Sequence, residues 1–347
     1  MGREMDAAGL RVMAEPLEAA VKSALREAGA SEASLADATK AMMHASRVGV
    51  DSHGVRLTEH YCTMLEGGRL KRDPQLTVTR KGASSAIVDG DDGLGHHAAY
   101  RAMHEAVTLA REVGIAGVGV RRSSHLGAAG AYALAAAEAG CIGFATTNTD
   151  SMVALFDGAA RFHGTNPLAY AAPVPGSRPW LLDMATSSIP MNRVLLHRSL
   201  NAPLPEGVAA DAQGAVTTDP QAVEMLLPLG GTEYGYKGAA LAGLATLLSA
   251  VLMDTTLDPD FIPMYGGADI STPRNMGHFF FAIDPERFAG STVFGANMLR
   301  YLGALRSAPT REGGRVMAPG DREWEESDRR ATGGIPVDPD TARFLRL

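Results

Sequence analysis

Two short segments place a histidine among small and polar residues, where the ring could exchange protons with a ligand. His53 lies in DSHGVR (51–56), and His125 lies in SSHLGAAG (123–130) after an apolar strand. An imidazole gains or loses a proton near physiological pH. Arg56 could hold a carboxylate by a two-pronged hydrogen bond. The alternative interpretation is structural, with the flanking serines and aspartate acting only as helix caps.

Three further segments combine turn-forming residues with groups that bind polar ligands. GTNP (164–167) contains an Asn-Pro turn signal. Asp183, in LLDMATS (181–187), lies at the end of an apolar strand and could accept hydrogen bonds from ribose hydroxyls. Lys237, in GYKG (235–238), could pair with phosphate or carboxylate, although the spacing is not that of a P-loop. Each segment can also be interpreted as a plain turn, cap or flexible loop.

Four histidines could instead form the metal site of a hydrolase. They are His53, His96, His97 and His125. None has the spacing of a helical His-x-x-x-His motif or of a Cys/His knuckle. We therefore expect no metal, and a His-rich, metal-dependent hydrolase stays as an alternative from another class.

Composition excludes several functions. The chain has 347 residues and a net charge of −7, so nucleic acid is not an expected partner. Two cysteines cannot form a disulfide framework. The most apolar helix-like stretch, 238–253, is shorter than a membrane span. The charged first residues are not followed by the apolar region of an export signal. We expect a cytoplasmic protein with no membrane partner.

The hydrophobic pattern predicts the elements that position these groups. Apolar residues from Leu10 to Leu25 recur at helical spacing, and Ser34 with Asp37 predicts a capping box for a second helix. Strands then alternate with helices, which is typical of a layered α/β protein. The charged last 35 residues are expected to be an ordered but exposed tail. Expected strands are 76–79, 85–89, 115–120, 141–146, 168–172, 180–184 and 278–283; further helices are 57–66, 95–113, 128–139, 187–200, 220–227, 238–254 and 285–305.

The order and separations of the five segments resemble the malate/L-lactate dehydrogenase family. That family includes ureidoglycolate and sulfolactate dehydrogenases, diketogulonate reductase and piperideine-2-carboxylate reductase. The likeness runs from about residue 10 to 340. It implies an oxidoreductase that uses NAD or NADP, usually a homodimer, with a mixed-sheet, layered α/β fold that is not the Rossmann fold. Residues 1–72 and 286–347 would form a helical lobe, and 73–285 the domain that binds cofactor and substrate.

The same resemblance implies roles for individual residues. His53 and His125 correspond to the two active-site histidines, one of which exchanges the proton while hydride moves. Which of the two does so stays open. Arg274 corresponds to a substrate-side arginine. The implied cofactor contacts are Thr149, Thr165, Asn166, Asp183, Met184, Ala185, Lys237, Pro319, Gly320 and Asp321.

One position departs from the family pattern. Several members place a substrate-binding arginine four residues after the first histidine, but Leu57 stands there and the arginine is Arg56. A shift of one residue turns a helical side chain by about 100°. Arg56 could therefore point elsewhere, which would leave Arg274 or His60 to hold the substrate.

The sequence thus predicts hydride transfer between nicotinamide and a small 2-hydroxy or 2-oxo acid of the malate, lactate or ureidoglycolate type. A base, a cation for the carboxylate and loops that position the cofactor are the parts required. The alternative within the same class is an NADPH-dependent reductase of cyclic 2-imino acids.

Overall fold

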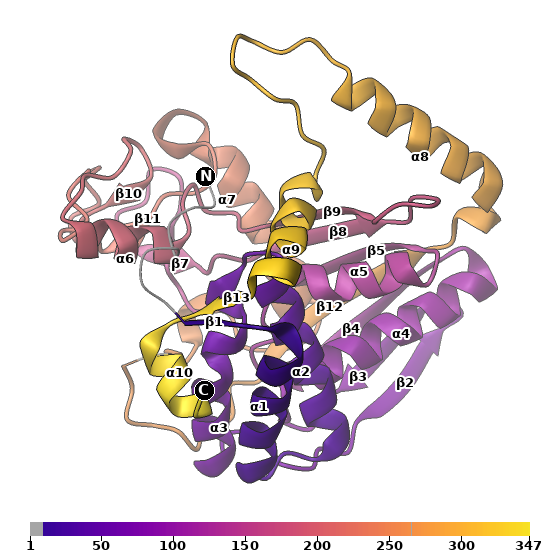
Figure 1. Ribbon diagram of the computed structural model, residues 1–347. Coiled ribbons are helices and arrows are strands. Elements are labelled where there is room, and N and C mark those ends of the chain that lie inside the picture. The colour runs from indigo at the N-terminus through magenta and orange to yellow at the C-terminus, as the bar shows by residue number, and fades with distance from the viewer. Residues whose placement is uncertain (1–9, 265) are drawn as a thin grey trace.

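A seven-stranded sheet forms the centre of the molecule in the computed structural model, which describes residues 10–264 and 266–347 (Figure 1). Across the sheet the strands are β2 (Thr77–Gly82), β3 (Ser85–Asp89), β4 (Ile115–Ser123), β12 (Met276–Ile283), β5 (Ile142–Thr147), β8 (Leu168–Ala172) and β9 (Trp180–Met184). β3 and β4 are parallel, and the other neighbouring pairs are antiparallel. The expected mixed-sheet, layered α/β fold is confirmed.

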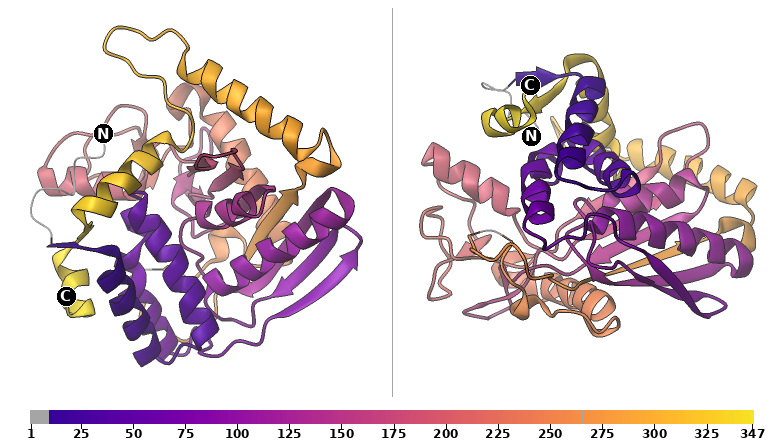
Figure 2. Two further views of the ribbon diagram at one scale, coloured as in Figure 1. Left: turned by 45° about the vertical axis from the view of Figure 1, so that its right-hand side comes forward. Right: turned by 90° about the horizontal axis from the view of Figure 1, so that it is seen from below.

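Helices cover both faces of this sheet (Figure 2). α4 (Gly95–Val113) and α5 (Gly130–Glu138) pack on one face, and α7 (Gly231–Thr246) packs on the other. Successive side chains of a strand point to opposite faces. In β12, Phe280 accordingly joins the core beneath α4 and α5, while Phe279 and Phe281 pack toward α7.

The N-terminal helices share one core with the C-terminus. They are α1 (Ala14–Glu27), α2 (Glu32–Arg47) and α3 (Thr58–Glu66). Leu17, Val21 and Leu25 of the predicted apolar stripe are buried, but Met13 precedes α1 and is exposed, and Leu10 belongs to strand β1 (Leu10–Val12) instead of the helix. β1 pairs with β13 (Ile335–Val337), a partner that local periodicity does not reveal. The capping box is also wrong, because Ser34 is buried inside α2 and Asp37 instead contacts His97 Nδ1 at 2.7 Å.

The predicted helix 220–227 is wrong as well. Its residues include β11 (Met225–Leu226), which belongs to a second sheet in the order β10-β11-β6-β7. The partners of β11 are β10 (Ala209–Ala210) and β6 (Val153–Ala154), and β7 (Arg161–His163) completes the sheet. These strands are too short to produce a periodic signal of their own. The helix before them, α6, is Met191–Leu200 and begins after Pro190 rather than at residue 187.

Three other helical boundaries differ from expectation. α7 begins at Gly231 and continues into a π-helical turn, Leu247–Val251. Gly290, with φ of +86°, separates a short 3₁₀ turn from α8 (Ser291–Arg306), which extends away from the sheet in Figure 1. The last residues form α9 (Asp321–Gly333), β13 and α10 (Pro339–Leu345) rather than an exposed tail. Pro339 is tolerated because the first helical turn needs no N–H from it. Among the described residues, no helix has the length and apolar character to cross a membrane.

Candidate active site

The two predicted histidines lie face to face. His53 ends a 3₁₀ turn (Asp51–His53) between α2 and α3, and His125 follows β4 and precedes α5. Their ring centroids are 5.6 Å apart and their planes differ by 26°. Asp51 does not cap a helix, because its carboxylate binds the Arg330 guanidinium of α9 at 2.9 Å. Helix α9 therefore holds the loop that carries His53.

Different hydrogen bonds surround the two rings. His53 Nδ1 lies 2.8 Å from the Ser52 hydroxyl, which can either donate or accept. His125 Nδ1 lies 2.7 Å from the Tyr61 hydroxyl and accepts a hydrogen bond from the Gly127 N–H at 3.3 Å. Because a backbone N–H can only donate, His125 Nδ1 has no proton and the neutral ring carries its hydrogen on Nε2. His53 has no such constraint.

The surrounding protein disfavours the charged form of both rings. Desolvation lowers the pKa of His53, and desolvation together with the neighbouring histidines lowers that of His125 well below its ordinary value. His96 is buried beside Tyr61, with ring centroids 4.7 Å apart, and desolvation lowers its pKa to about 3. Its neighbour His97 binds Asp37 instead. Within residues 10–264 and 266–347 no three His, Cys, Asp or Glu side chains are placed to hold a metal.

The cationic side of the site is built by Arg274. Its guanidinium is buried, pairs with Asp150 and lies 4.9 Å from the ring centroid of Phe261. Burial and the charge of Arg274 lower the pKa of His60 to about 4, and the same charge acts on His125.

Arg56 lies apart from this group. Its side chain is exposed, and it lines a small recess with Asp338 and Thr341 near the C-terminus. Its charge helps to hold the pKa of Asp338 below the ordinary value, although burial opposes this. Leu57, at the position of the family arginine, is buried. Arg56 is therefore placed against the C-terminal segment.

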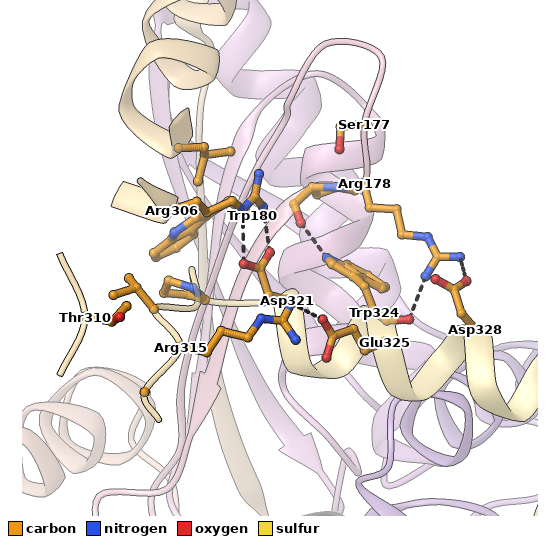
Figure 3. Close-up of a pocket in the computed structure, with 15 residues that line it drawn as sticks. Ser177, Arg178, Trp180, Arg306, Thr310, Arg315, Asp321, Trp324, Glu325 and Asp328 are labelled. Carbon is orange, nitrogen blue, oxygen red and sulfur yellow. Dashed lines mark hydrogen bonds and ion pairs between the residues drawn. The ribbon is translucent and has the colours of Figure 1, made fainter. Parts of the chain in front are cut away.

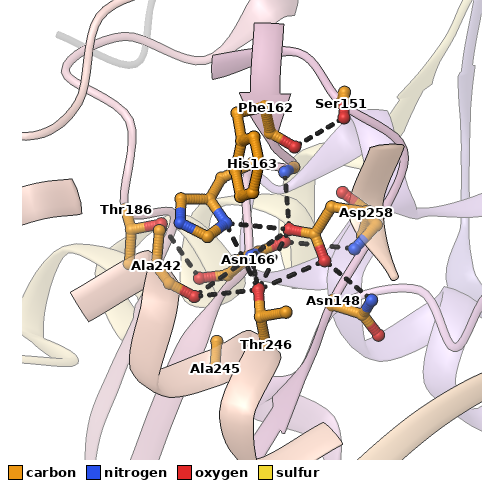
Figure 4. A network of polar contacts seen from close by, with 12 residues as sticks. Asn148, Ser151, Phe162, His163, Asn166, Thr186, Ala242, Ala245, Thr246 and Asp258 are labelled. Atoms are coloured by element: carbon orange, nitrogen blue, oxygen red, sulfur yellow. Dashed lines mark hydrogen bonds and ion pairs between the residues drawn. The ribbon is translucent and has the colours of Figure 1, made fainter. Parts of the chain in front are cut away.

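Asn166 orders one of the expected cofactor-binding loops (Figure 4). Its Oδ1 accepts from the Thr149 N–H at 3.1 Å, and its Nδ2 donates to Asp258 at 2.7 Å. The Thr165 N–H donates to Thr149 Oγ1 at 3.2 Å. The side-chain amide of Asn166 is occupied by protein partners. Through these bonds Asn166 positions Thr149 directly, and it positions Thr165 through Thr149.

Asp258 is the centre of this network, and sequence reasoning missed it. Its carboxylate accepts from Asn148 Nδ2 at 2.8 Å and from the Gly164 N–H at 3.1 Å, and it contacts His163 Nδ1 at 3.1 Å. The Thr246 hydroxyl also donates to it. In the sequence, Asp258 belongs to an Asp-Pro-Asp turn that carries no ligand-binding signature.

A second expected cofactor segment lies against the first. Asp183 is the second-to-last residue of β9, and its Oδ2 accepts from the Gly130 N–H at 2.8 Å. Desolvation raises the pKa of Asp183 to about 6, although the Gly130 hydrogen bond opposes this rise. Met184 and Ala185 follow, and Thr186 donates its N–H to the Thr165 carbonyl at 2.9 Å. The segments 164–166 and 183–186 thus form adjacent walls.

A pocket of about 470 Å³ lies at the other end of β9 (Figure 3). The Leu181 N–H donates to the Pro319 carbonyl at 3.3 Å, so the Pro319-Gly320-Asp321 segment packs on the same strand as Asp183. Asp321 binds Arg306 at 2.6 Å. The buried Nε1 of Trp180 has no hydrogen-bond partner among the described residues. The pocket is lined by Trp180, Pro319, Asp321 and three arginines, Arg178, Arg306 and Arg315.

Lys237 is exposed on α7. Its Nζ lies 5.2 Å from the ring centroid of Tyr234 and 5.9 Å from that of Tyr236. The aromatic rings orient the ammonium group through weak cation–π contacts. The two tyrosines are themselves half exposed, so this cationic group remains accessible to a ligand.

The chain is similar to characterised dehydrogenases over nearly its full length. The family model for malate/L-lactate dehydrogenase matches residues 12–346. A ureidoglycolate dehydrogenase (NAD(+)) of Escherichia coli O157:H7 is 33% identical over 339 residues, covering 97% of this chain and 95% of the relative. The structure of malate dehydrogenase from Entamoeba histolytica has a TM-score of 0.91 at 26% identity and covers 98% of this chain and 97% of that one. The structure of delta1-piperideine-2-carboxylate reductase from Pseudomonas syringae has a TM-score of 0.84 at 26% identity and covers 97% of this chain and 99% of that one.

Proposed function

The chain belongs to the malate/L-lactate dehydrogenase family and is an oxidoreductase, and from that premise we propose that it transfers hydride between NAD or NADP and a small 2-hydroxy or 2-oxo acid. The observation that supports this most is the stacked His53–His125 pair beside the buried charge of Arg274. These groups supply the proton exchange and the carboxylate clamp that the reaction needs.

We assign the proton exchange to His53. The Ser52 hydroxyl can accept from His53 Nδ1–H whether or not Nε2 is protonated, so the ring can take up and release a proton. The Gly127 N–H prevents the same change at His125, which remains a neutral donor through Nε2 and can polarise the substrate oxygen. In reduction, the 2-oxo carbon gains a hydride and its oxygen gains the proton from His53; oxidation reverses both transfers.

The residues present fit a nicotinamide dinucleotide. Asp183 offers a carboxylate near one end of β9, and the pocket at the other end contains three arginines, each paired with a carboxylate, and the unpartnered Trp180 N–H. We propose that the two adjacent walls, the Pro319–Asp321 segment and Lys237 hold it. When bound, this group supplies or accepts the hydride.

Gly130→Ala tests the cofactor assignment. A Cβ at Gly130 would lie 2.7 Å from Asp183 Oδ2, so the carboxylate must move. We expect the cofactor KM to rise by about tenfold, the equivalent of one lost charged hydrogen bond. The melting temperature should also fall slightly, because the added Cβ crowds Asp183 and Gly130 is the first residue of α5, where the helix-interior advantage of alanine over glycine does not apply. Gly303→Ala in α8, where a Cβ meets nothing within 4 Å, is the matched control. An unchanged KM would remove Asp183 from the cofactor site.

The direct test of function follows the loss of reduced-nicotinamide absorbance with NADH and NADPH against malate-, lactate- and ureidoglycolate-type 2-oxo acids. Turnover with one acid would support the proposal and identify the preferred cofactor. The structural similarity to a piperideine-2-carboxylate reductase favours a second candidate, reduction of a cyclic 2-imino acid. A preformed cyclic imine in the same panel separates the two. No turnover with any compound would contradict both.

We further propose that the protein acts as a cytoplasmic homodimer. Val293, Leu299 and Tyr301 of α8 are each at least half exposed, as is the preceding Phe288. Packing such a helix against a second copy would remove apolar surface from water. Light scattering should give twice the 36.3-kDa chain mass, and cell fractionation should place the protein in the cytosol.

A further inference from the structure

The buried side chain of α9 is that of Arg330, and it carries a full positive charge. Just 4% of its surface is exposed. Its guanidinium forms a two-pronged pair with the Asp51 carboxylate, in which Nη2 donates to Oδ2 at 2.9 Å. Nη1 also donates to the Ser46 carbonyl at 2.6 Å, and Nε donates to Glu326. All three nitrogens therefore have acceptors, and the buried charge is matched by two carboxylates.

The two acceptors outside α9 belong to the segment that carries His53. Ser46 lies in the last turn of α2, and Asp51 begins the 3₁₀ turn that His53 ends. The buried hydroxyl of Ser46 also accepts from the Val55 N–H at 3.0 Å, just beyond His53 in the chain. Arg330 therefore binds both the turn that presents His53 and the residue on which that turn rests.

Glu326 makes a second contact between α9 and this loop. Gly49 ends α2 in the left-handed conformation, with φ of +85°. A Cβ at Gly49 would lie 2.9 Å from Glu326 Cγ, so the glutamate side chain packs directly on the loop backbone. Glu326 and Arg330 are four residues apart and therefore share one face of the helix. That face holds the His53 loop by charge and by close packing.

The other end of α9 is anchored beside the segment expected to contact the cofactor. Pro319–Asp321 leads into the helix, and Trp324 Nε1 in its first turn donates to the Pro179 carbonyl at 2.9 Å (Figure 3). From the end of that segment to Arg330 the helix rises by about 14 Å. A helix transmits position as a stiff body when both of its ends are bonded. α9 therefore sets the His53 loop relative to the cofactor segment.

We propose that Arg330 is a positioning residue for the reaction: through Asp51 it holds the His53 ring in the geometry that proton exchange requires, and through α9 it fixes that ring relative to the cofactor. Arg330 acts through Asp51 and not by contact with the reacting atoms. A displacement of about 1 Å in a catalytic group can cost about a hundredfold in rate. This inference rests on the proposed function, because it concerns the role assigned to His53.

Arg330→Lys and Asp51→Asn break the two-pronged pair from either side. Lysine keeps the charge but cannot form the fork, and Asp51→Asn leaves the guanidinium with Glu326 and a backbone carbonyl, so the fold is retained. Each should lower kcat about 10- to 100-fold, with the cofactor KM unchanged within about twofold. In a His53→Gln background the same substitutions should lower kcat by no more than about twofold, because the group that they position is absent. Arg322→Lys, on the exposed face of α9, is the control. Equal losses in both backgrounds would mean that the pair only supports the fold, and would overturn the role.

A measurement without turnover separates this inference from the proposed function. In protein isotope-labelled at histidine Cε1, the NMR signal of His53 is the one that vanishes in His53→Gln. It should be single and sharp in the wild type and in Arg322→Lys. In Arg330→Lys it should broaden or split, and its pKa should move up toward 6.5 as the loosened ring gains water. An unchanged signal in Arg330→Lys would overturn the positioning role but leave hydride transfer standing. If no acid is reduced, the proposed function fails, and this signal alone decides whether Arg330 holds His53.

Discussion

His53→Gln lowers kcat/KM for oxidation of the 2-hydroxy acid by about 10²- to 10⁴-fold, the usual contribution of a positioned acid or base. Glutamine retains a polar side chain of similar size but cannot take up the hydroxyl proton. Folding should be preserved, because the ring is only partly buried and its Nδ1 contact is to the neighbouring Ser52. His104→Gln, on the exposed face of α4, is the matched control and should retain wild-type rates.

The pH dependence provides a second signature of His53. Desolvation lowers its pKa below the ordinary 6.5, so the neutral, proton-accepting form persists into mildly acidic solution. In the oxidation direction, kcat/KM should therefore stay level as the pH falls past 6.5 and decline only below the lowered pKa. In the reduction direction the protonated ring is the donor, so kcat/KM should rise as the pH falls through the same value.

His125→Gln distinguishes the two rings. In this variant the pH-independent value of kcat/KM should fall, because the Nε2–H donor is lost. The decline of kcat/KM for oxidation at low pH (the acid limb) should remain, since His53 still titrates. In His53→Gln the acid limb itself should disappear from the residual activity. The opposite pattern, with the limb lost only in His125→Gln, would assign the proton transfer to His125 and contradict the hydrogen-bond argument from Gly127.

The sequence predicts the parts of the site that lie at strand ends, and physical reasons explain why. His125 follows an apolar strand and Asp183 lies at the end of one, where side chains of a sheet converge on a ligand. The resemblance to the malate/L-lactate dehydrogenase family assigns a role to His53, and it rests on the order of the segments and their separations along the chain. Neither source gives the face-to-face rings or the tautomer of His125, because these depend on Tyr61 and on the backbone of Gly127.

The missed residues are those whose partners lie far away in the chain. Asp258 is bonded to Asn148, His163 and Asn166, each more than ninety positions earlier. β1 was missed for the same reason, since three residues become a strand only when β13 pairs with them. Local periodicity contains no information on such contacts.

Asp258→Ala should lower the free energy of unfolding by about 3–5 kcal/mol, the loss expected when one partner of a buried charged network is removed. The substitution leaves the Asn148 and Asn166 amides and the Gly164 N–H without their acceptor in a buried region. Because Asn166 also orders Thr149 and Thr165, the cofactor KM should rise as well. Asp258→Asn, which keeps the volume but removes the charge, should lie between the wild type and alanine.

Urea unfolding at several pH values measures this loss of free energy. Asp340→Ala, on the exposed surface, is the control, and its free energy of unfolding should change by no more than about 0.5 kcal/mol. Burial would raise the pKa of Asp258, but its hydrogen bonds outweigh this and hold it below the ordinary 3.8. A group with a lowered folded-state pKa stabilises the protein above its unfolded-state pKa, and that contribution is lost as the pH falls through the folded value. The difference between wild type and Asp258→Ala should therefore be constant near neutral pH and shrink only below about pH 4. A difference under 1 kcal/mol at neutral pH would mean that the network can rearrange without its carboxylate, and the ordering of the cofactor loop would then need another source.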